Sequence, residues 1–431
     1  MGRAAFRQIG ERFRKLRTGV VLFAVILVNF TLTRPSPVDI AFALALAMTP
    51  FCAQKMTRRG IVFLALIVAW WTGMMVSSWP HSYDEDVVYQ LTKTSYAISI
   101  GITACLVSMH WTRDQVERLF QFWIFSASIA ATLATIGFAL QIEDLVWDGR
   151  GKAFLDDPNM YAAFVLPAFL GCIYFILTGR NRKLYSALLG LMVVGLLVAF
   201  SRVAIAAALG TGLALTVILN RRLLVKTSTA LFIVGALAVA VGAVAILSFP
   251  EFAEKLADRA TLAKDYDSGE TGRLARYLKS FNLMLDHPEG MGVLQFEKIF
   301  PEPIHNFWLG SFVNYGWLAG FAWTFIVYFG LALTIRNYRH TGDNLMLLVF
   351  LSWLAIFGCA LLHEAERWRH LWFFTGIMWG VTARNWPQRA RVPEPVRAGT
   401  AGPQAMPVPS ALRHQQIPLH GVRGSATGTL T

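Results

Sequence analysis

Long apolar stretches separated by short polar links run through most of the chain up to residue 249 and resume at residue 305. An apolar stretch of about 20 residues is long enough to cross the hydrocarbon core of a bilayer as a helix. The pattern predicts about twelve such helices. They are expected at 18–33, 38–54, 60–78, 89–109, 117–140, 159–178, 184–200, 203–219, 227–249, 305–335, 343–362 and 370–385. The predicted fold is an all-α polytopic membrane protein.

The links between the apolar stretches divide the chain into five parts. Only Ser201 and Arg202 separate the predicted helices 184–200 and 203–219, so the pattern leaves open whether these form two spans or one long helix. The final segment is rich in Pro, Arg, Gly and Ser and has few large apolar residues, which predicts a disordered tail. The expected parts are a basic N-terminus (1–17), helices one to nine (18–249), a long polar loop (250–304), helices ten to twelve (305–386) and the tail (387–431).

The composition supports a membrane protein and argues against a soluble domain and against a nucleic-acid-binding protein. The chain is 55% hydrophobic and 15% charged, whereas about 25% charged residues is usual in soluble domains. The net charge is +13, but the basic residues lie in links between apolar runs and not on one face, so no nucleic-acid partner is expected. The cysteines lie in or beside apolar stretches and predict no disulfide framework. They are Cys52, Cys105, Cys172 and Cys359.

Basic residues mark alternate links and thereby predict the orientation in the membrane. Arginine and lysine precede the first predicted helix and follow each even-numbered one, whereas acidic residues occupy the links after the third and fifth helices. Basic links face the cytoplasm in most membrane proteins. Both termini are therefore predicted to be cytoplasmic, and the first apolar run is expected to remain as a span because no cleavage site follows it. The 250–304 loop is predicted to face the periplasm.

The 250–304 loop has a recognisable internal pattern. Residues 249–258 predict a short amphipathic segment, and a helix is expected to start at Ser268 or Thr271 and to run to about Leu285. The following HPEGMG sequence ends that helix, because Pro288 cannot continue it and the glycines allow a tight return. A loop with this much organisation on the outer side of a membrane protein predicts a functional site.

The loop helix and its exit carry the first candidate site residues. Arg273 and Arg276 lie three positions apart near the start of the helix, where the helix dipole favours anions. A solvated helix face is the alternative for both. His305 begins the tenth predicted span, and Asn306 beside it can cap that helix or bind substrate. Histidine titrates near neutral pH and suits removal of a proton from a hydroxyl group.

Three further places contribute candidates. Arg202 lies between two apolar stretches, where an interface anchor and a phosphate clamp are equally compatible with the sequence. Asp157 and Asn159 flank a proline at a predicted helix start, which favours a helix cap over a substrate contact. In HEAERWR, at 363–369, Arg367 belongs either to a salt-bridged turn or to a second wall of an anion site. The sequence HExxR lacks the second histidine of a zinc protease motif.

Taken in order, these motifs resemble the O-antigen ligase and O-antigen polymerase superfamily. The matching segments are DPN at 157–159, SR at 201–202, GRLARYLKSFNLMLDHPEGMG at 272–292, and HNFWLGSFVNYGWLAG at 305–320. Tyr277 stands near the position where many members have tryptophan. The resemblance covers roughly residues 60 to 385.

The resemblance implies a bacterial inner-membrane glycosyltransferase with a GT-C-like arrangement of helices and no cofactor or metal. Its members move a glycan from undecaprenyl diphosphate to an acceptor on the periplasmic side. The acceptor is lipid A–core in ligases, another glycan repeat in polymerases, and a protein in related oligosaccharyltransferases. By position, Arg202 and Arg273 would hold the diphosphate and His305 would activate or orient the acceptor hydroxyl. The expected further substrate contacts are Arg276, Asn306, Arg367, Asn159 and Asp157.

We therefore expect an O-antigen ligase acting among membrane lipids, with an O-antigen or exopolysaccharide polymerase as the close alternative. A polysaccharide-lipid transporter or flippase is the alternative from another class. Transporters of this size often contain two similar halves around a central cytoplasmic loop. The sequence has no repeated half, and its longest loop lies late in the chain and on the predicted outer side. These features favour the transferase.

Overall fold

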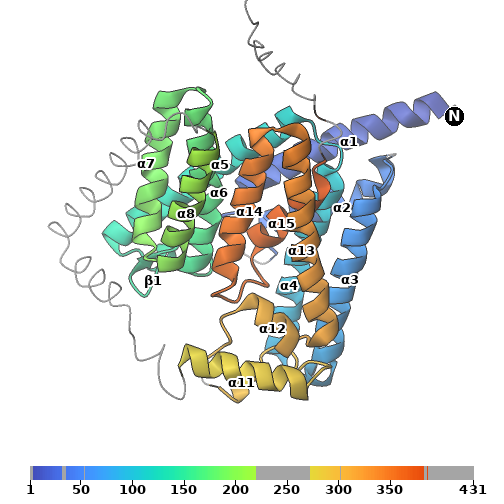
Figure 1. Ribbon diagram of the computed structural model, residues 1–431, viewed down its shortest axis with the longest axis vertical. Coiled ribbons are helices and arrows are strands. Elements are labelled where there is room, and N and C mark those ends of the chain that lie inside the picture. The colour runs from blue at the N-terminus through green and yellow to red at the C-terminus, as the bar shows by residue number, and fades with distance from the viewer. Residues whose placement is uncertain are drawn as a thin grey trace, which may run out of the picture. The chain divides into compact units, whose positions relative to one another are not determined.

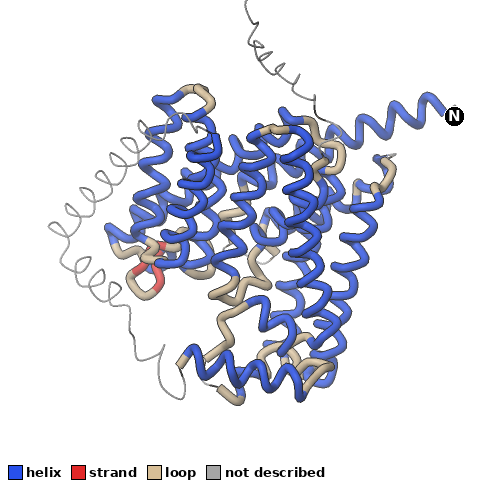
Figure 2. The backbone as a smooth tube through the Cα atoms, viewed as in Figure 1, coloured by secondary structure: helices blue, strands red, loops and turns tan. Residues whose placement is uncertain are grey.

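The computed structural model describes residues 3–31, 35–52, 54–219, 272–300, 302–382 and 386. Helices make up most of these residues, and the strands among them form one two-stranded hairpin (Figure 2). The α-helices are α1 (Arg3–Ile26), α2 (Pro37–Ala47), α3 (Arg58–Ser78), α4 (Glu85–Ser108), α5 (Arg113–Leu140), α6 (Pro158–Leu177), α7 (Arg182–Val198), α8 (Arg202–Leu219), α11 (Arg273–Asp286), α12 (Phe307–Val313), α13 (Gly316–Thr341), α14 (Asn344–Ala360) and α15 (Arg369–Gly380). The hairpin pairs β1 (Val146–Trp147) with β2 (Arg150–Gly151). Short 3-10 helices lie at Thr49–Cys52, Trp79–His81, Glu143–Leu145 and Phe296–Lys298.

Five of the described helices are long and apolar enough to cross a membrane. They comprise α5, α6, α8, α13, and α3 together with the turn that follows it. The helices α2 and α14 are also apolar but shorter. This all-helical arrangement is that of a polytopic membrane protein. The predicted ninth span at 227–249, the loop segment 250–271 and the tail at 387–431 lie outside the described residues. The four cysteines are buried and free.

The apolar stretch around Ser201 forms two helices, which answers the alternative left open by the sequence. Helix α7 ends at Val198 and α8 begins at Arg202. Phe200, between them, has a left-handed backbone with φ of 49°, a conformation that no helix continues through. Arg150 donates from Nε to the carbonyl oxygen of Ala199 at 2.9 Å and so holds the break in place.

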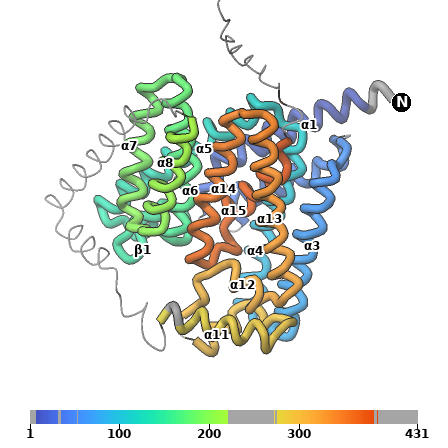
Figure 3. Tube along the Cα trace, viewed as in Figure 1, coloured from blue at the N-terminus to red at the C-terminus, as the bar shows by residue number. Residues whose placement is uncertain are grey.

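The tenth predicted span, 305–335, is wrong as a single helix. The chain forms the short α12 and then α13, with a break at Tyr315 (Figure 3). The cause is the HPEGMG segment, which docks on the break through backbone hydrogen bonds. Met291 N donates to Val313 O at 2.9 Å, Gly292 N donates to Asn314 O at 2.8 Å, and Trp317 N donates to Pro288 O at 2.9 Å.

Two glycines make this docking possible. Gly290 and Gly316 have φ of +88° and +79°, which side chains on L-residues disfavour. A Cβ on Gly290 would lie 2.4 Å from the backbone nitrogen of Gly316. Neither position therefore accepts a larger residue without moving the backbone, and the pair fixes where α12 points.

A cluster of aromatic rings forms the core beneath α12. Trp70 of α3 contacts Trp372 of α15 with 5.1 Å between ring centroids, and Trp323 of α13 contacts Trp372 at 5.3 Å. Phe307, the first residue of α12, lies 4.5 Å from the ring of Trp323. Edge-to-face and offset contacts of this kind stabilise aromatic pairs beyond the area that they bury. The residue immediately after Asn306 is thus anchored on a rigid core.

Helices α4 and α15 approach each other closely because small residues line their contact. A Cβ on Gly376 would lie 2.1 Å from the carbonyl oxygen of Gly101, and a Cβ on Gly380 would lie 2.1 Å from Ser108 Oγ. Glycines at such contacts let helix backbones pack tightly in membranes. The close contact fixes the second half of α15 against α4.

Candidate functional site

Several polar links gather at one end of the helices. The hairpin β1–β2, helices α11 and α12, and the link from α14 to α15 all lie toward the lower side of Figure 1. These links are the ones that the charge distribution assigns to the periplasm, with the candidate residues Asp157, Asn159, His305, Asn306 and Arg367 in or beside them.

The DPN segment caps α6 and binds an arginine that the sequence did not single out. Asp157 Oδ1 accepts from the backbone nitrogens of Asn159 at 2.7 Å and Met160 at 2.9 Å. The Asn159 Oδ1 atom accepts from Arg150 Nη2 at 2.9 Å. The predicted helix cap is confirmed, and a substrate contact for either residue stays a prediction.

Arg150 connects the cap of α6 to the break before α8. Its side chain is buried, and it donates both to Asn159 and to the carbonyl oxygen of Ala199. Arg202, half-buried, follows this break directly as the first residue of α8. Arg150 therefore fixes the backbone from which Arg202 projects. The Asp148-Gly149 pair is typical of a turn. This turn leads the chain back toward α6, and it is the signal in the sequence that could have indicated the position of Arg150.

Arg276 lies inside the protein and holds the segment that leads to His305. Its side chain is fully buried, and Nη1 lies 2.5 Å from Glu302 Oε2 and 3.1 Å from the carbonyl oxygen of Pro303. The alternative of a solvated helix face is wrong for Arg276, because Glu302 and Pro303 draw its guanidinium inward. Arg273 is the first residue of the same helix, α11.

His305 has an unusual backbone that its neighbours support from several sides. Its φ is 52°, in the left-handed region that non-glycine residues rarely occupy and that recurs at functional sites. Ile304 before it is buried in a small apolar cluster. Asn306 after it caps α12 by accepting from Leu309 N at 2.9 Å. Tyr277 OH donates to the His305 carbonyl oxygen at 3.4 Å. The imidazole is thus attached to a preorganised backbone.

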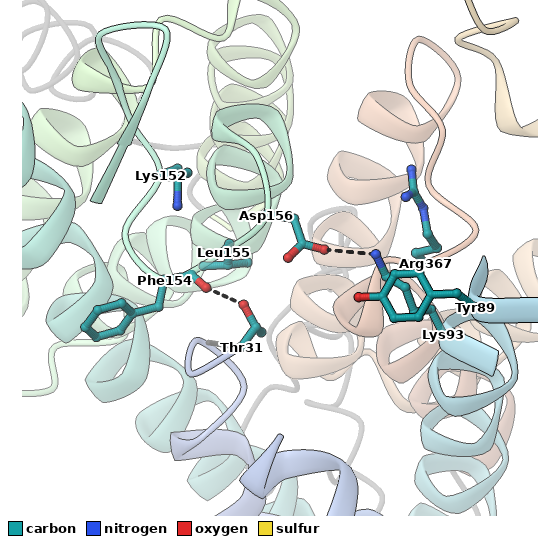
Figure 4. A pocket seen from close by; sticks show the side chains of 8 residues that line it. All are labelled: Thr31, Tyr89, Lys93, Lys152, Phe154, Leu155, Asp156 and Arg367. Atoms are coloured by element: carbon teal, nitrogen blue, oxygen red, sulfur yellow. Dashed lines mark hydrogen bonds and ion pairs between the residues drawn. The ribbon is translucent and has the colours of Figure 1, made fainter. Parts of the chain in front are cut away.

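The links at this end of the molecule also contribute to a cationic cavity, and Figure 4 shows the side chains that line it. Its volume is about 630 Å³, within the usual range of small-molecule sites. The side chains that line it are Thr31, Tyr89, Lys93, Lys152, Phe154, Leu155, Asp156 and Arg367. Three of them are basic and one is acidic, so the cavity favours an anion.

Among the basic residues that line the cavity, Lys93 lies within a helix, α4. Its Nζ lies 3.8 Å from Asp156 Oδ2 and 5.0 Å from the centroid of the Tyr89 ring. Its side chain is 16% exposed, so it is largely removed from bulk water. Interactions between charges are stronger there than in bulk water. Lys93 lies inside the predicted span 89–109, and its charge within an apolar stretch is the sequence signal that could have singled it out. Lys152 gave no signal, because the fold alone brings its link beside α4.

Arg367 belongs both to a salt-bridged turn and to the wall of the cavity. Its Nη1 donates to Gln90 Oε1 at 3.1 Å, and its guanidinium lies 3.7 Å from Glu364 and 3.9 Å from Glu366. Burial alone would lower the pKa of Arg367, but Glu366 and Glu364 outweigh burial and raise it. The two alternatives drawn from the sequence are therefore geometrically compatible, because Arg367 binds the acidic side chains of the turn and also lines the cavity.

Comparison with known protein families adds a finding that the geometry alone does not supply. The family model described as O-antigen ligase matches residues 187–324. This segment is similar to the O-antigen ligase family. A search of curated proteins finds no match. The resemblance to the O-antigen ligase and polymerase superfamily is thus confirmed.

The O-antigen ligase segment contains some of the candidate residues and not others. Arg202, Arg273, Arg276, His305 and Asn306 lie within residues 187–324. The remaining candidates lie outside it, as do the basic side chains of the cavity. Glu302, which sequence reasoning missed, lies inside the segment and pairs with Arg276. The fold brings the cavity residues to the same end of the molecule as the O-antigen ligase segment's loops.

Replacing Glu302 with glutamine tests how much the ion pair between Arg276 and Glu302 stabilises the segment that leads to His305. The substitution leaves the buried Arg276 guanidinium without the carboxylate that neutralises it. Removing one partner of a fully buried pair costs roughly 3–5 kcal/mol. Because the Glu302 side chain is 48% exposed, we expect about 2 kcal/mol for Glu302→Gln. Thermal unfolding in detergent measures the loss, and the double variant R276M/E302Q should recover most of it. A double variant no more stable than Glu302→Gln would contradict the pairing.

The buried carboxyl group of Glu364 is expected to make the stability of the protein depend on pH. Burial raises the pKa of Glu364 well above its usual range, the carboxylates of Glu366 and Glu297 raise it further, and Arg367 opposes the rise. The folded protein then prefers the protonated form, so its stability falls as the pH rises through this pKa. Each tenfold change in proton affinity corresponds to about 1.4 kcal/mol.

We therefore expect Glu364→Gln to be more stable than the wild type at pH 8. The difference should shrink as the pH falls and vanish near pH 4, where Glu364 is protonated in both states. Thermal unfolding midpoints between pH 4 and pH 8 provide the measurement. Glu289→Gln, at an exposed glutamate of the HPEGMG segment, serves as the control and should show no such gain. A constant difference between Glu364→Gln and wild type at all pH values would refute the prediction.

Proposed function

We propose that the protein is an O-antigen ligase that transfers a glycan from undecaprenyl diphosphate to lipid A–core on the periplasmic side of the bacterial inner membrane. The observation that carries this proposal is that the O-antigen ligase match at 187–324 contains Arg202, Arg273 and His305 together. The left-handed, supported backbone at His305 adds to it, since such strain recurs at functional sites.

The proposed reaction is a single displacement at the anomeric carbon of the donor glycan. The acceptor hydroxyl oxygen forms the new glycosidic bond while the bond from the anomeric carbon to the diphosphate oxygen breaks. His305 takes the proton of the acceptor hydroxyl. Arg202 and Arg273 neutralise the negative charge on the departing undecaprenyl diphosphate, because a guanidinium binds two phosphate oxygens at once. A single displacement inverts the configuration at that carbon.

The cationic cavity is proposed to hold an anionic group of the donor or of the acceptor. Lys93, Lys152 and Arg367 supply the positive charge, and Asp156 keeps Lys93 in position at 3.8 Å. The ring of Tyr89 offers an apolar face beside these charges, as sugar-binding surfaces require. Asp157, Asn159, Arg276 and Asn306 then serve the site chiefly by fixing its backbone.

The test is a chromosomal deletion complemented with wild type, Arg202→Ala, Arg273→Ala or His305→Asn, followed by analysis of the envelope glycans. Full-length polymer on the lipid carrier together with bare lipid A–core supports the ligase. Accumulation of single repeats indicates a polymerase instead. Lys279→Ala, at an exposed lysine on α11, is the matched control for Arg273→Ala. Normal glycans in all three variants, at unchanged protein levels in the membrane, would reject the proposed site.

A further inference from the structure

A second cavity lies at the opposite end of α13 from His305, near the C-terminus of that helix. Its volume is about 410 Å³, and it is lined by Ala332, Ile335, Arg336, Arg339 and His340. Positions 332, 335, 336 and 339 follow the spacing that places residues on one helix face. The cavity therefore combines an apolar side with a cationic side along a single helix.

The positive charge at this cavity is not neutralised within the described part of the chain. The ion pairs found there involve neither Arg336 nor Arg339. Arg59 of α3 adds a third guanidinium, because its Nη1 donates to Asn337 Oδ1 at 3.3 Å and its charge lies close enough to Arg336 to repel it. Like charges held together without an acidic partner favour a bound anion.

The surface of α13 between these cations and the N-terminus of the helix is apolar and exposed. Helix α13 is one of the five candidate membrane spans, and large apolar side chains on it remain exposed along its length. These are Trp317, Leu318, Phe321, Phe325, Tyr328, Phe329 and Ile335. The basic end of α13 is the end that the charge distribution assigns to the cytoplasm. A ligand at the cavity would thus have an anionic head at the membrane surface and apolar chains within the bilayer.

We propose that this cavity binds the phosphate head group of an anionic phospholipid from the cytoplasmic leaflet, with the acyl chains lying along the exposed apolar face of α13. Arg336 and Arg339 bind the phosphate oxygens, and Arg59 strengthens the local positive field. Basic sites beside membrane helices on the cytoplasmic side bind such head groups. The site is separate from the proposed transferase site, and its existence does not depend on the proposed function.

The experiment measures lipid binding to the purified full-length protein in detergent. Phosphatidylglycerol, phosphatidylcholine and inorganic phosphate are each titrated, and the thermal unfolding midpoint and native mass spectra are recorded. Phosphatidylglycerol should raise the midpoint of the wild type and remain bound in the spectrometer. Arg336→Gln with Arg339→Gln should weaken its binding by roughly tenfold or more.

Two further double variants make the result decisive. Arg182→Gln with Lys183→Gln removes the two exposed basic residues that begin α7, on the same predicted side and away from the cavity. It should bind phosphatidylglycerol like the wild type. Arg336→Lys with Arg339→Lys keeps the charge and should retain most of the binding, which separates binding from folding. Equal losses in the Gln variants at both places, an equal effect of phosphatidylcholine, or an equal effect of inorganic phosphate would overturn the proposal.

Discussion

Replacing His305 with asparagine is expected to lower the rate of glycan transfer by about 10²–10⁴-fold, the usual contribution of a positioned acid–base residue. Asparagine tolerates the left-handed backbone that His305 adopts at φ of 52°. The fold should therefore be preserved, while the side chain loses its capacity to take a proton at neutral pH. Transfer from a lipid-linked glycan donor to lipid A–core by the purified protein in lipid measures the rate.

Two neighbouring substitutions separate chemistry from structure at this position. Asn306→Ser keeps an oxygen that can cap α12, and its rate should remain within about tenfold of the wild type because a serine cap is nearly equivalent. His305→Ala should combine the catalytic loss with a lower unfolding midpoint, since alanine disfavours the left-handed region. A His305→Asn variant that transfers glycan at nearly the wild-type rate would remove His305 from the proposed mechanism.

Replacing Asp39 with asparagine is expected to destabilise the protein by about 3–5 kcal/mol. Arg369, at the start of α15, donates from Nε to Asp39 Oδ1 and from Nη2 to Asp39 Oδ2, both at 2.8 Å. The side chain of Arg369 is 11% exposed and that of Asp39 is 2% exposed. Ser36 donates to the same carboxylate from its backbone nitrogen and its hydroxyl. Asparagine keeps the shape and can still accept from Ser36, but it leaves the guanidinium charge uncompensated.

The double variant D39L/R369M should recover most of that loss, because it removes both charges and keeps the volume. Asp84→Asn is the matched control, since Asp84 forms a more exposed ion pair with Lys298 at 3.9 Å and asparagine can keep capping α4. Its expected cost is at most about 1 kcal/mol. Thermal unfolding in detergent compares the three variants, and equal midpoints for Asp39→Asn and Asp84→Asn would contradict the assigned role.

This ion pair also bears on the cavity. Arg369 lies two positions after Arg367, and Asp39 fixes the start of α15 against α2. The link between α14 and α15 is thereby held at both ends, which positions Arg367 beside Gln90 and the cavity. A loss of glycan transfer in Asp39→Asn beyond its loss of folded protein would show that the position of this link matters for the reaction.

The sequence by itself determined the features that depend on neighbouring residues. Apolar stretches indicated the helical membrane architecture, because bilayer thickness sets the length of a span. Local hydrogen bonding predicted that Asp157 would start α6, and the amphipathic pattern predicted α11 to within a few residues. The ordered motifs led to the O-antigen ligase superfamily, which the match at 187–324 confirmed. The catalytic roles assigned to Arg202, Arg273 and His305 stay predictions.

Only the tertiary structure decided the features that depend on distant segments. The tenth predicted span is broken because residues 288–292 bind the backbone between α12 and α13, and no local signal in an apolar stretch encodes that contact. Arg276 is buried because Glu302 neutralises it from 26 positions away. The cavity exists because α4 brings Lys93 beside Asp156 and Arg367. Charges and backbone groups acquire these partners through the packing of helices, and helix periodicity alone does not specify that packing.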